Sequence, residues 1–251
     1  MVGLKSFLIS FTGILFILIV GCSATTTPKG GLGAYISDTK VISLIDAAEN
    51  GDAGKVKHLV NSGVNINYIG KEGWTPLLWL MSSKNHDGIR LLLDSGANPN
   101  LVTWDDNSAV TFAAGGSEVD LHTLRLLLES GGDPDAFGYN GETALILAIK
   151  RRQWRHMDLL LKYGADINKQ NKHNTSMPLS AAALEGQYEK VYYLLEKGAD
   201  YKKKNRFGYS LAHLMNYPIG DASPWKKRVQ GWLENKGITF PVPTPIKKEG
   251  I

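Results

Sequence analysis

The side chains that most often carry chemistry are sparse and scattered in this sequence of 251 residues. It has a single cysteine, Cys22, and six histidines: His58, His86, His122, His156, His173 and His213. None of these histidines belongs to an H-E-x-x-H motif or has a second ligand-type residue at the spacing of a metal site. No nucleophile elbow, phosphate-binding loop or paired-carboxylate pattern is present. The sequence therefore predicts no catalytic residue, no metal site and no cofactor, and it leaves a hydrolase with an unrecognised site as a minor alternative.

Cys22 lies directly after an apolar N-terminal segment. Lys5 supplies one positive charge, residues 7–20 are mostly apolar, and Gly21, Cys22 and Ser23 are small. This run is shorter than the ~20 residues that a membrane-spanning helix needs. It indicates a signal peptide over residues 1–21.

The stretch Ile19-Val20-Gly21-Cys22 resembles the bacterial lipobox. The resemblance implies that the Cys22 thiol is acylated, with palmitate-type chains, and that the new amino terminus receives a further acyl chain. Two or more chains hold a protein stably at a bilayer. In the resembled lipoprotein class, an Asp directly after the cysteine favours the inner membrane. This chain has Ser23 there, so the resemblance implies a periplasm-facing lipoprotein of the bacterial outer membrane. The alternative is an incidental cysteine in the leader.

Both ends of the mature chain have the composition of linkers. Residues 22–39 are rich in Thr, Gly and Ser, which predicts a flexible linker from the lipidated cysteine. Residues 241–251 begin with a proline-rich run and are expected to form an extended tail that lies over the end of the domain.

Between these ends, one short pattern recurs along the chain. Residues 160–168 read L-L-K-Y-G-A-D-I-N, and close copies occupy residues 92–100, 127–135 and 194–200, with weaker ones at 59–67 and 232–237. The pattern glycines are Gly63, Gly96, Gly131, Gly164, Gly198 and Gly237, so successive numbers differ by 33, 35, 33, 34 and 39. A period of about 33 residues indicates a repeat protein.

The chemistry of the pattern explains its shape. The two leucines end an apolar helix face, and the glycine after them takes the left-handed conformation that closes a helix. The Asn and Asp residues that follow favour a tight turn. About ten residues later Thr75 and Pro76 are suited to begin the next helix, as cap and first residue.

The helix starts at Gly73-Trp74-Thr75-Pro76-Leu77, Gly141-Glu142-Thr143-Ala144-Leu145 and Gly208-Tyr209-Ser210-Leu211-Ala212-His213 resemble the ankyrin motif G-x-T-P-L-H. The resemblance covers about residues 41–238. It implies an all-α solenoid of about six helix-pair units over residues 40–240, with hairpin-like fingers between the pairs. His213 stands where the family has a structural, hydrogen-bonding histidine.

Composition agrees with one repeat domain. The chain is 43% hydrophobic and 21% charged, with a net charge of +4 and a pI near 9.0. A solenoid needs no central core, because each unit buries its apolar face on the next. We expect a monomer whose basic surface suits an acidic protein partner, and no binding of nucleic acid.

In the resembled family, partners bind the fingers and the exposed side of the first helix of each pair. Counting from each turn glycine places the following candidates on that surface: Lys71, Trp74, Trp104, Phe137, Tyr139, Lys150, Arg151, Lys172, His173, Arg206, Phe207 and Tyr209. Aromatic and arginine side chains dominate binding hot spots. The alternatives are that Trp74, Phe137 and Phe207 pack between fingers and that the basic runs are solvated faces.

These observations predict a membrane-tethered, periplasmic protein-binding scaffold rather than an enzyme. Bacterial lipoproteins of this repeat class include immunity proteins that neutralise secreted, envelope-acting effectors, and a secreted toxin is the partner that this resemblance implies. The alternative is an adaptor for envelope assembly or stress protection.

Overall fold

The computed structural model describes residues 31–103, 106–115, 121–220 and 222–245. The predicted signal peptide, the lipobox with Cys22, and Trp104 lie outside the described residues. The described chain is all-helical and contains no β-strand beyond a single bridge between Phe137 and Thr143. None of its helices is long and apolar enough to cross a membrane.

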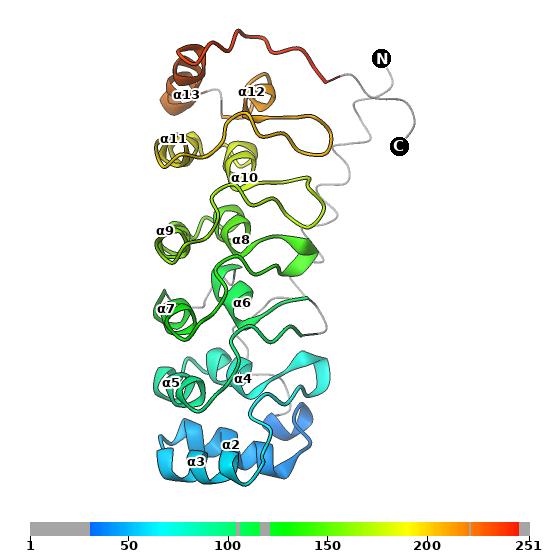
Figure 1. The fold of residues 1–251 in the computed structure, drawn as a ribbon, viewed down its shortest axis with the longest axis vertical. Coiled ribbons are helices and arrows are strands. Elements are labelled where there is room, and N and C mark those ends of the chain that lie inside the picture. The colour runs from blue at the N-terminus through cyan, green and yellow to red at the C-terminus, as the bar shows by residue number, and fades with distance from the viewer. Residues whose placement is uncertain (1–30, 104–105, 116–120, 221, 246–251) are drawn as a thin grey trace, which may run out of the picture.

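The described residues form twelve α-helices, which pair in sequence order, and the six pairs stack in one column (Figure 1). The pairs are α2 (Thr39–Glu49) with α3 (Ala53–Asn61), α4 (Pro76–Ser82) with α5 (His86–Asp94), α6 (Ala109–Gly115) with α7 (Leu121–Glu129), α8 (Ala144–Lys150) with α9 (Trp154–Lys162), α10 (Pro178–Leu184) with α11 (Tyr188–Glu196), and α12 (Leu211–Leu214) with α13 (Pro224–Glu234). We call the first helix of each pair inner and the second outer. The predicted all-α solenoid of about six units is confirmed.

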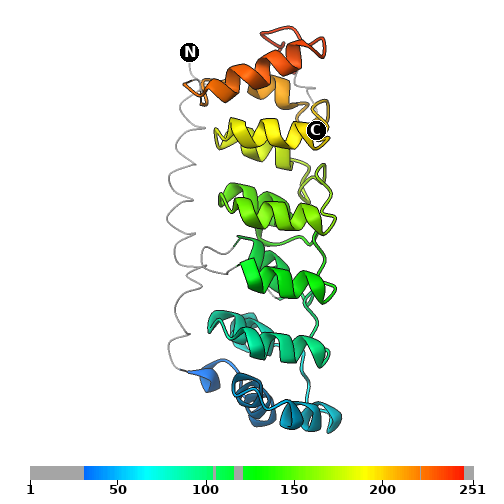
Figure 2. The ribbon, with the colours of Figure 1, turned by 90° about the vertical axis from the view of Figure 1, so that its left-hand side faces the viewer.

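The loops from each outer helix to the next inner helix project together on the side of the inner helices (Figure 1). We call these loops the second to sixth fingers, after the unit that each one enters. Short 3-10 turns lie in two of them, η2 (Lys71–Gly73) in the second and η3 (Tyr139–Gly141) in the fourth. Figure 2, turned toward the outer helices, shows these helices stacked as a separate face.

The helix boundaries follow the local signals in the sequence. Thr75 caps α4 by accepting a hydrogen bond from Leu78 N at 3.1 Å, and Pro76 is its first residue. The pattern glycines close the outer helices with φ values of 84° to 100°, Gly164 at 90° among them. Left-handed φ is costly for other residues, so these glycines fix where each outer helix ends.

The core is a continuous layer between neighbouring units rather than one central cluster. Leu80, Leu92, Leu127, Leu145 and Leu160 are fully buried along the column. Because each unit covers the apolar face of the next, the stack is stabilised by nearest-neighbour packing.

Both ends of the described chain pack onto the solenoid. The turn η1 (Leu32–Ala34) precedes Ile36, which is fully buried, and Tyr35 O accepts a hydrogen bond from Lys71 N at 2.8 Å. The part of the expected linker that the structure describes thus takes the place of a finger on the first unit. At the other end, Val242 N and O bond to the Asn216 side chain at 3.2 and 2.7 Å, which holds the tail over α12 (Figure 1).

Candidate protein-binding surface

The fingers are held in a row by a ladder of Asn and Asp side chains at their bases. The side-chain oxygen of one finger accepts a backbone N–H from the next finger at four steps: Asn67 from Asn98 at 2.8 Å, Asn100 from Asp133 at 2.7 Å, Asp135 from Asp166 at 2.9 Å, and Asn168 from Asp200 at 2.7 Å. Each bond spans 31 to 33 residues, one repeat length. The ladder sets the spacing at which finger side chains are presented.

Three fingers are also linked to the one before them near their tips. Tyr139 N donates to Asn107 Oδ1 at 3.0 Å, Lys172 N to Gly141 O at 2.9 Å, and Arg206 N to Asn174 O at 2.7 Å. These bonds reduce the motion of the residues that we predicted to contact a partner. A rigid surface loses less conformational entropy on binding than a mobile loop does.

Large apolar side chains are exposed on these fingers. The exposed fraction is 46% for Ile69, 54% for Val102, 44% for Tyr139 and 56% for Phe207. A hollow of about 210 Å³ lies beside Val102 and Phe137 at the third and fourth fingers. Exposed apolar groups next to a hollow suit the anchor side chains of a partner.

Charged groups surround this apolar surface. Lys172 Nζ lies 3.8 Å from Asp106 Oδ2 and 5.7 Å from the centre of the Phe137 ring, and Lys169 Nζ lies 5.0 Å from the same ring. The Arg206 guanidinium lies 4.9 Å over the exposed Phe207 ring. Cations stacked on rings present aromatic and positive character together.

The sixth finger is the most positive one. Its side chains Lys202, Lys204 and Arg206 are exposed, and none has a carboxylate of the described chain within ion-pair distance. Burial is the main cause that lowers the pKa of nearby His213 below 6.5, and the positive charge of Lys204 lowers it further. This finger is the part of the surface best suited to an acidic group.

Several predicted residues are positioned by neighbours that the sequence did not identify. Trp74 is half-buried between Tyr35 and Trp79, with ring centres at 5.9 and 5.8 Å, so it also supports the stack. Tyr209 is half-buried with its ring 5.7 Å from that of His213. Phe137 is half-buried as well, beneath the two lysines.

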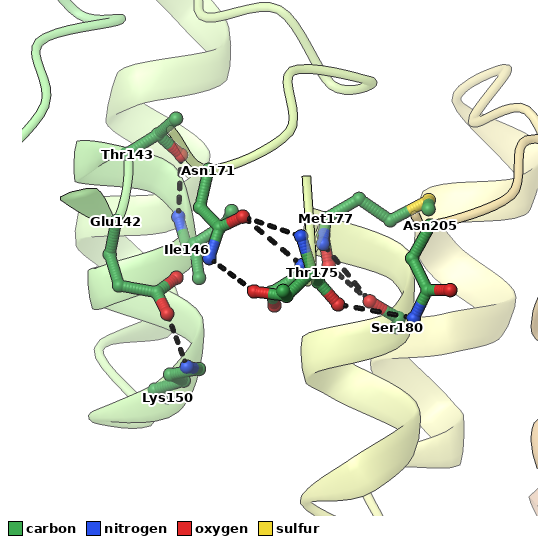
Figure 3. A network of polar contacts seen from close by, with 10 residues as sticks. Glu142, Thr143, Ile146, Lys150, Asn171, Thr175, Met177, Ser180 and Asn205 are labelled. Carbon is green, nitrogen blue, oxygen red and sulfur yellow. Dashed lines mark hydrogen bonds and ion pairs between the residues drawn. The ribbon is translucent and has the colours of Figure 1, made fainter. Parts of the chain in front are cut away.

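The basic candidates divide between paired and open positions. Lys150 donates to Glu142 (Figure 3). Nζ lies 2.7 Å from Oε1, and the glutamate side chain is 11% exposed. Arg151 follows α8 and is exposed. Lys71 and His173 are exposed on the second and fifth fingers, and Lys71 Nζ lies 3.9 Å from Glu72 Oε1. Lys150 therefore has an internal partner that competes with any external one.

The fifth finger absorbs one extra residue before α10. Asn171 Oδ1 accepts from Thr175 N at 2.8 Å and Ser176 N at 3.2 Å, and Asn205 Nδ2 donates to Thr175 O at 3.3 Å (Figure 3). Pro178 remains the first residue of α10. Asn171 and Asn205, one repeat apart, thus hold the fifth finger in register with its neighbours. The sequence analysis did not predict this role.

One serine and one histidine lie close enough to raise the question of catalysis. Ser210 Oγ is 2.9 Å from His213 Nδ1, which also accepts Ser210 N at 3.1 Å. Both residues are buried at the start of α12, and the His213 ring also bonds to the Pro243 backbone. Because Nδ1 accepts the Ser210 backbone N–H at the first turn of α12, the pair acts as a helix cap. The described residues also bring together no group of three or more His, Cys, Asp or Glu side chains that could hold a metal ion.

Comparison with protein families settles the class of this scaffold. The family model for ankyrin repeats (three copies) matches residues 17–103, 44–137 and 112–205. The chain belongs to the ankyrin repeat family. Ankyrin repeats are in general scaffolds for protein–protein interaction.

The curated relatives share only part of their length with this chain. "Ankyrin repeat, SAM and basic leucine zipper domain-containing protein 1" of Carollia perspicillata is 37% identical over 68 residues, which cover 27% of this chain and 14% of that protein. The mitochondrial disaggregase of Bos taurus is 28% identical over 158 residues, covering 61% of this chain and 22% of that protein. These matches reflect a shared ankyrin region.

Solved ankyrin structures superpose over most of the solenoid. The ankyrin repeat domain of Bcl-3, a member of the IkappaB protein family, matches with a TM-score of 0.65 and 26% identity, covering 80% of this chain and 89% of that one. The ankyrin repeat protein EF0377 matches with a TM-score of 0.62 and 26% identity, covering 76% and 97%.

Proposed function

We propose that this ankyrin protein is a lipid-anchored, periplasm-facing scaffold that binds another protein through its fingers. The observation that carries the proposal is the row of exposed apolar and cationic side chains, Val102, Tyr139, Phe207 and Arg206, on fingers fixed by the Asn/Asp ladder. Such a surface combines the aromatic anchors and charges that dominate protein interfaces.

The anchor part of the proposal rests on the N-terminal sequence. Cys22 is the only thiol in the chain, follows an apolar segment and is the last residue of a lipobox-like stretch. Acylation at Cys22 would hold the solenoid at the outer membrane. Replacing Cys22 with Ser should then abolish incorporation of a palmitate analogue, and unchanged labelling of this variant would refute the lipoprotein assignment.

The partner that we propose is a secreted, envelope-acting effector, which the scaffold would neutralise as an immunity protein. The open cations on the sixth finger favour a partner with an acidic contact region. Steric cover by a rigid scaffold requires no catalysis, which agrees with the structural roles of Ser210 and His213.

The experiment is an affinity capture with the full chain, solubilised from envelopes and analysed by mass spectrometry, beside a Phe207→Ala/Tyr139→Ala variant. A partner lost from the variant and encoded next to this chain as a toxin supports the immunity function. A partner from the envelope assembly machinery, lost in the same way, would replace the immunity function with an adaptor role. Equal capture by both proteins would contradict binding through the fingers.

A further inference from the structure

The outer helices near the C-terminal end carry a second, different surface. Aromatic side chains there donate to a carboxylate on the preceding outer helix: Tyr193 OH to Asp158 at 2.7 Å, and Trp232 Nε1 to Glu196 at 3.1 Å. Both bonds span one repeat. They tie these aromatic side chains to the neighbouring outer helix.

Many cations of this face have no carboxylate partner within the described chain. Within the described chain, no carboxylate lies within ion-pair distance of Arg155, Lys162, Lys197, Lys227, Arg228 or Lys236. We call these six residues, with the rings of Trp154, Tyr192, Tyr193, Trp225 and Trp232, the outer basic patch. All six cations are exposed.

The cations of the outer basic patch lie against its rings. Arg228 is 5.0 Å from the Trp225 ring centre and 5.3 Å from that of Tyr192, Lys197 is 5.0 Å from Tyr193, and Lys236 is 5.2 Å from Trp232. The rings themselves are only half-exposed. The patch therefore exposes cationic groups that lie on partly buried rings, and none of its rings is fully exposed as an apolar anchor would be.

The patch is confined to the last three outer helices, α9, α11 and α13. The earlier ones, α3, α5 and α7, contain no Trp, Tyr or Phe. The aromatic residues of the outer helices are therefore concentrated at the C-terminal end of the column, where the rings of the patch pack partly against the core and stay partly exposed.

We propose that the outer basic patch docks on the surface of an anionic phospholipid bilayer. Arg and Lys side chains pair with lipid phosphates, and Trp and Tyr rings favour the headgroup region, where one edge is apolar and the other hydrated. A protein partner of high affinity would instead need exposed apolar anchors. On this chain such anchors, Tyr139 and Phe207, lie on the fingers.

The position of the patch makes docking compatible with partner binding. The outer helices form the side of the column away from the fingers (Figures 1 and 2). A solenoid lying on its outer face would therefore direct its fingers away from the bilayer. The inference goes beyond the proposed function, because partner binding by the fingers does not require contact of the outer helices with lipid.

The test is lysine acetylation footprinting of the full chain, carrying Cys22→Ser so that acylation plays no part, with vesicles. One set contains phosphatidylcholine alone and the other phosphatidylcholine mixed with phosphatidylglycerol. Lys162, Lys227 and Lys236 should be acetylated about tenfold more slowly with the anionic vesicles, since each basic residue near the surface adds to the attraction. Lys202 and Lys204 on the sixth finger should react equally fast with both. High salt should remove the protection, because exposed charges are screened.

Two charge-matched variants complete the test. Lys227→Glu/Arg228→Glu should abolish protection of Lys162 and Lys236, whereas Lys202→Glu/Lys204→Glu, with the same change in net charge, should preserve it.

Equal reactivity of the patch lysines in both vesicle types, or equal effects of the two variants, would overturn the proposal. Protection of these lysines by a captured protein partner without vesicles would also overturn it and assign the patch to a protein interface. Loss of partner capture alone would contradict the proposed function and leave the docking result unaffected.

Discussion

Asn100 joins the third finger to the fourth by accepting a hydrogen bond from Asp133 N on its Oδ1 at 2.7 Å. Its Nδ2 donates to Gly131 O at 2.9 Å in the same loop. The corresponding residue one repeat later is Asp135, which accepts from Asp166 N at 2.9 Å but has no N–H to donate. Lys169 Nζ lies 3.8 Å from its second oxygen instead. The ladder thus accommodates either Asn or Asp. The second polar atom of the side chain bonds to a backbone oxygen in the case of Asn100 and lies near a lysine in the case of Asp135.

The first prediction separates these two bonds. Asn100→Ala removes both and should lower the free energy of unfolding by about 1–2 kcal/mol, while Asn100→Asp keeps the acceptor and should cost about half as much. Urea unfolding measures both values. Asn61→Ala, on the exposed end of α3, is the control and should change stability by less than about 0.5 kcal/mol. An Asn100→Ala variant as stable as this control would show that the ladder bond contributes nothing measurable.

The second prediction contrasts two glycines. Gly164 has φ of 90° and open space where a Cβ would lie, whereas at Gly138 a Cβ would come within 2.7 Å of Asn107 Oδ1 and 2.8 Å of Thr111 Cβ. Gly164→Val should cost about 1–3 kcal/mol through backbone strain, and Gly164→Asn should cost less because Asn tolerates this conformation. Gly138→Ala should destabilise through overpacking, by about 1–3 kcal/mol. Thermal melts that show Gly164→Asn and Gly164→Val to be equal would argue against strain.

The sequence was most informative where the backbone itself carries the signal. Glycine spacing located the outer-helix ends, and Thr75 with Pro76 located a helix start, because both depend on local conformation. Lateral contacts were harder to predict: Lys150 with Glu142, and Tyr193 with Asp158, depend on how side chains from successive turns or units meet. The last pair is 35 residues apart, close to the repeat period, so comparing positions one period apart would have suggested it.

The third prediction concerns acid stability of the last repeat. Burial chiefly, with Lys204 adding to it, lowers the pKa of His213 below 6.5, so the folded protein favours the neutral ring that accepts Ser210 N. A depressed folded pKa contributes stability that is present above pH 6.5 and is lost as pH falls through the folded value. Part of the fall in the free energy of unfolding between neutral and acidic pH is therefore due to His213. The His213→Gln variant should lack that part. Melts of both proteins over that range measure the difference.

Lys204 provides an independent check on His213. Lys204→Gln should raise the pKa of His213, followed by NMR titration of the ring, because it removes a nearby positive charge. Lys55→Gln, on the first repeat, makes the same charge change far along the chain and should leave it unaltered. An equal shift of the His213 pKa in both variants would mean that net charge, and not the nearby Lys204, causes the effect.

The fourth prediction concerns the phenol that links α11 to α9. Burial, and then the hydrogen bond to Asp158 and its charge, raise the pKa of Tyr193 from 10.0 to about 12. A raised folded pKa contributes stability that is complete below pH 10 and is lost as pH rises through about 12. Ultraviolet titration follows phenol ionisation, and the difference between the titration curves of the wild type and Tyr193→Phe should show one phenol that ionises near pH 12. Asp158→Asn should move it back toward 10, and no movement would contradict the role of the carboxylate.

The fifth prediction connects the fingers to binding. Tyr139→Ala with Phe207→Ala removes two side chains that are 44% and 56% exposed, so the melting temperature should hardly change. If both are anchors, binding of the captured partner should weaken by about 2–4 kcal/mol, measured by calorimetry with the purified partner. Arg206→Glu should act mainly on the association rate and its salt dependence, because exposed charges steer encounter more than they hold a complex.

Trp74 is the matched control for that double variant. It is aromatic and lies at the second finger, but it packs between Tyr35 and Trp79. Trp74→Ala should therefore destabilise the first repeats, by up to about 3 kcal/mol, and should reduce binding only to the extent that the folded fraction falls. A double variant that unfolds like Trp74→Ala would mean that Tyr139 and Phe207 are structural. A double variant that is folded and binds with full affinity would move the contact surface off the tips of the fourth and sixth fingers, and Trp104→Ala would then test the third.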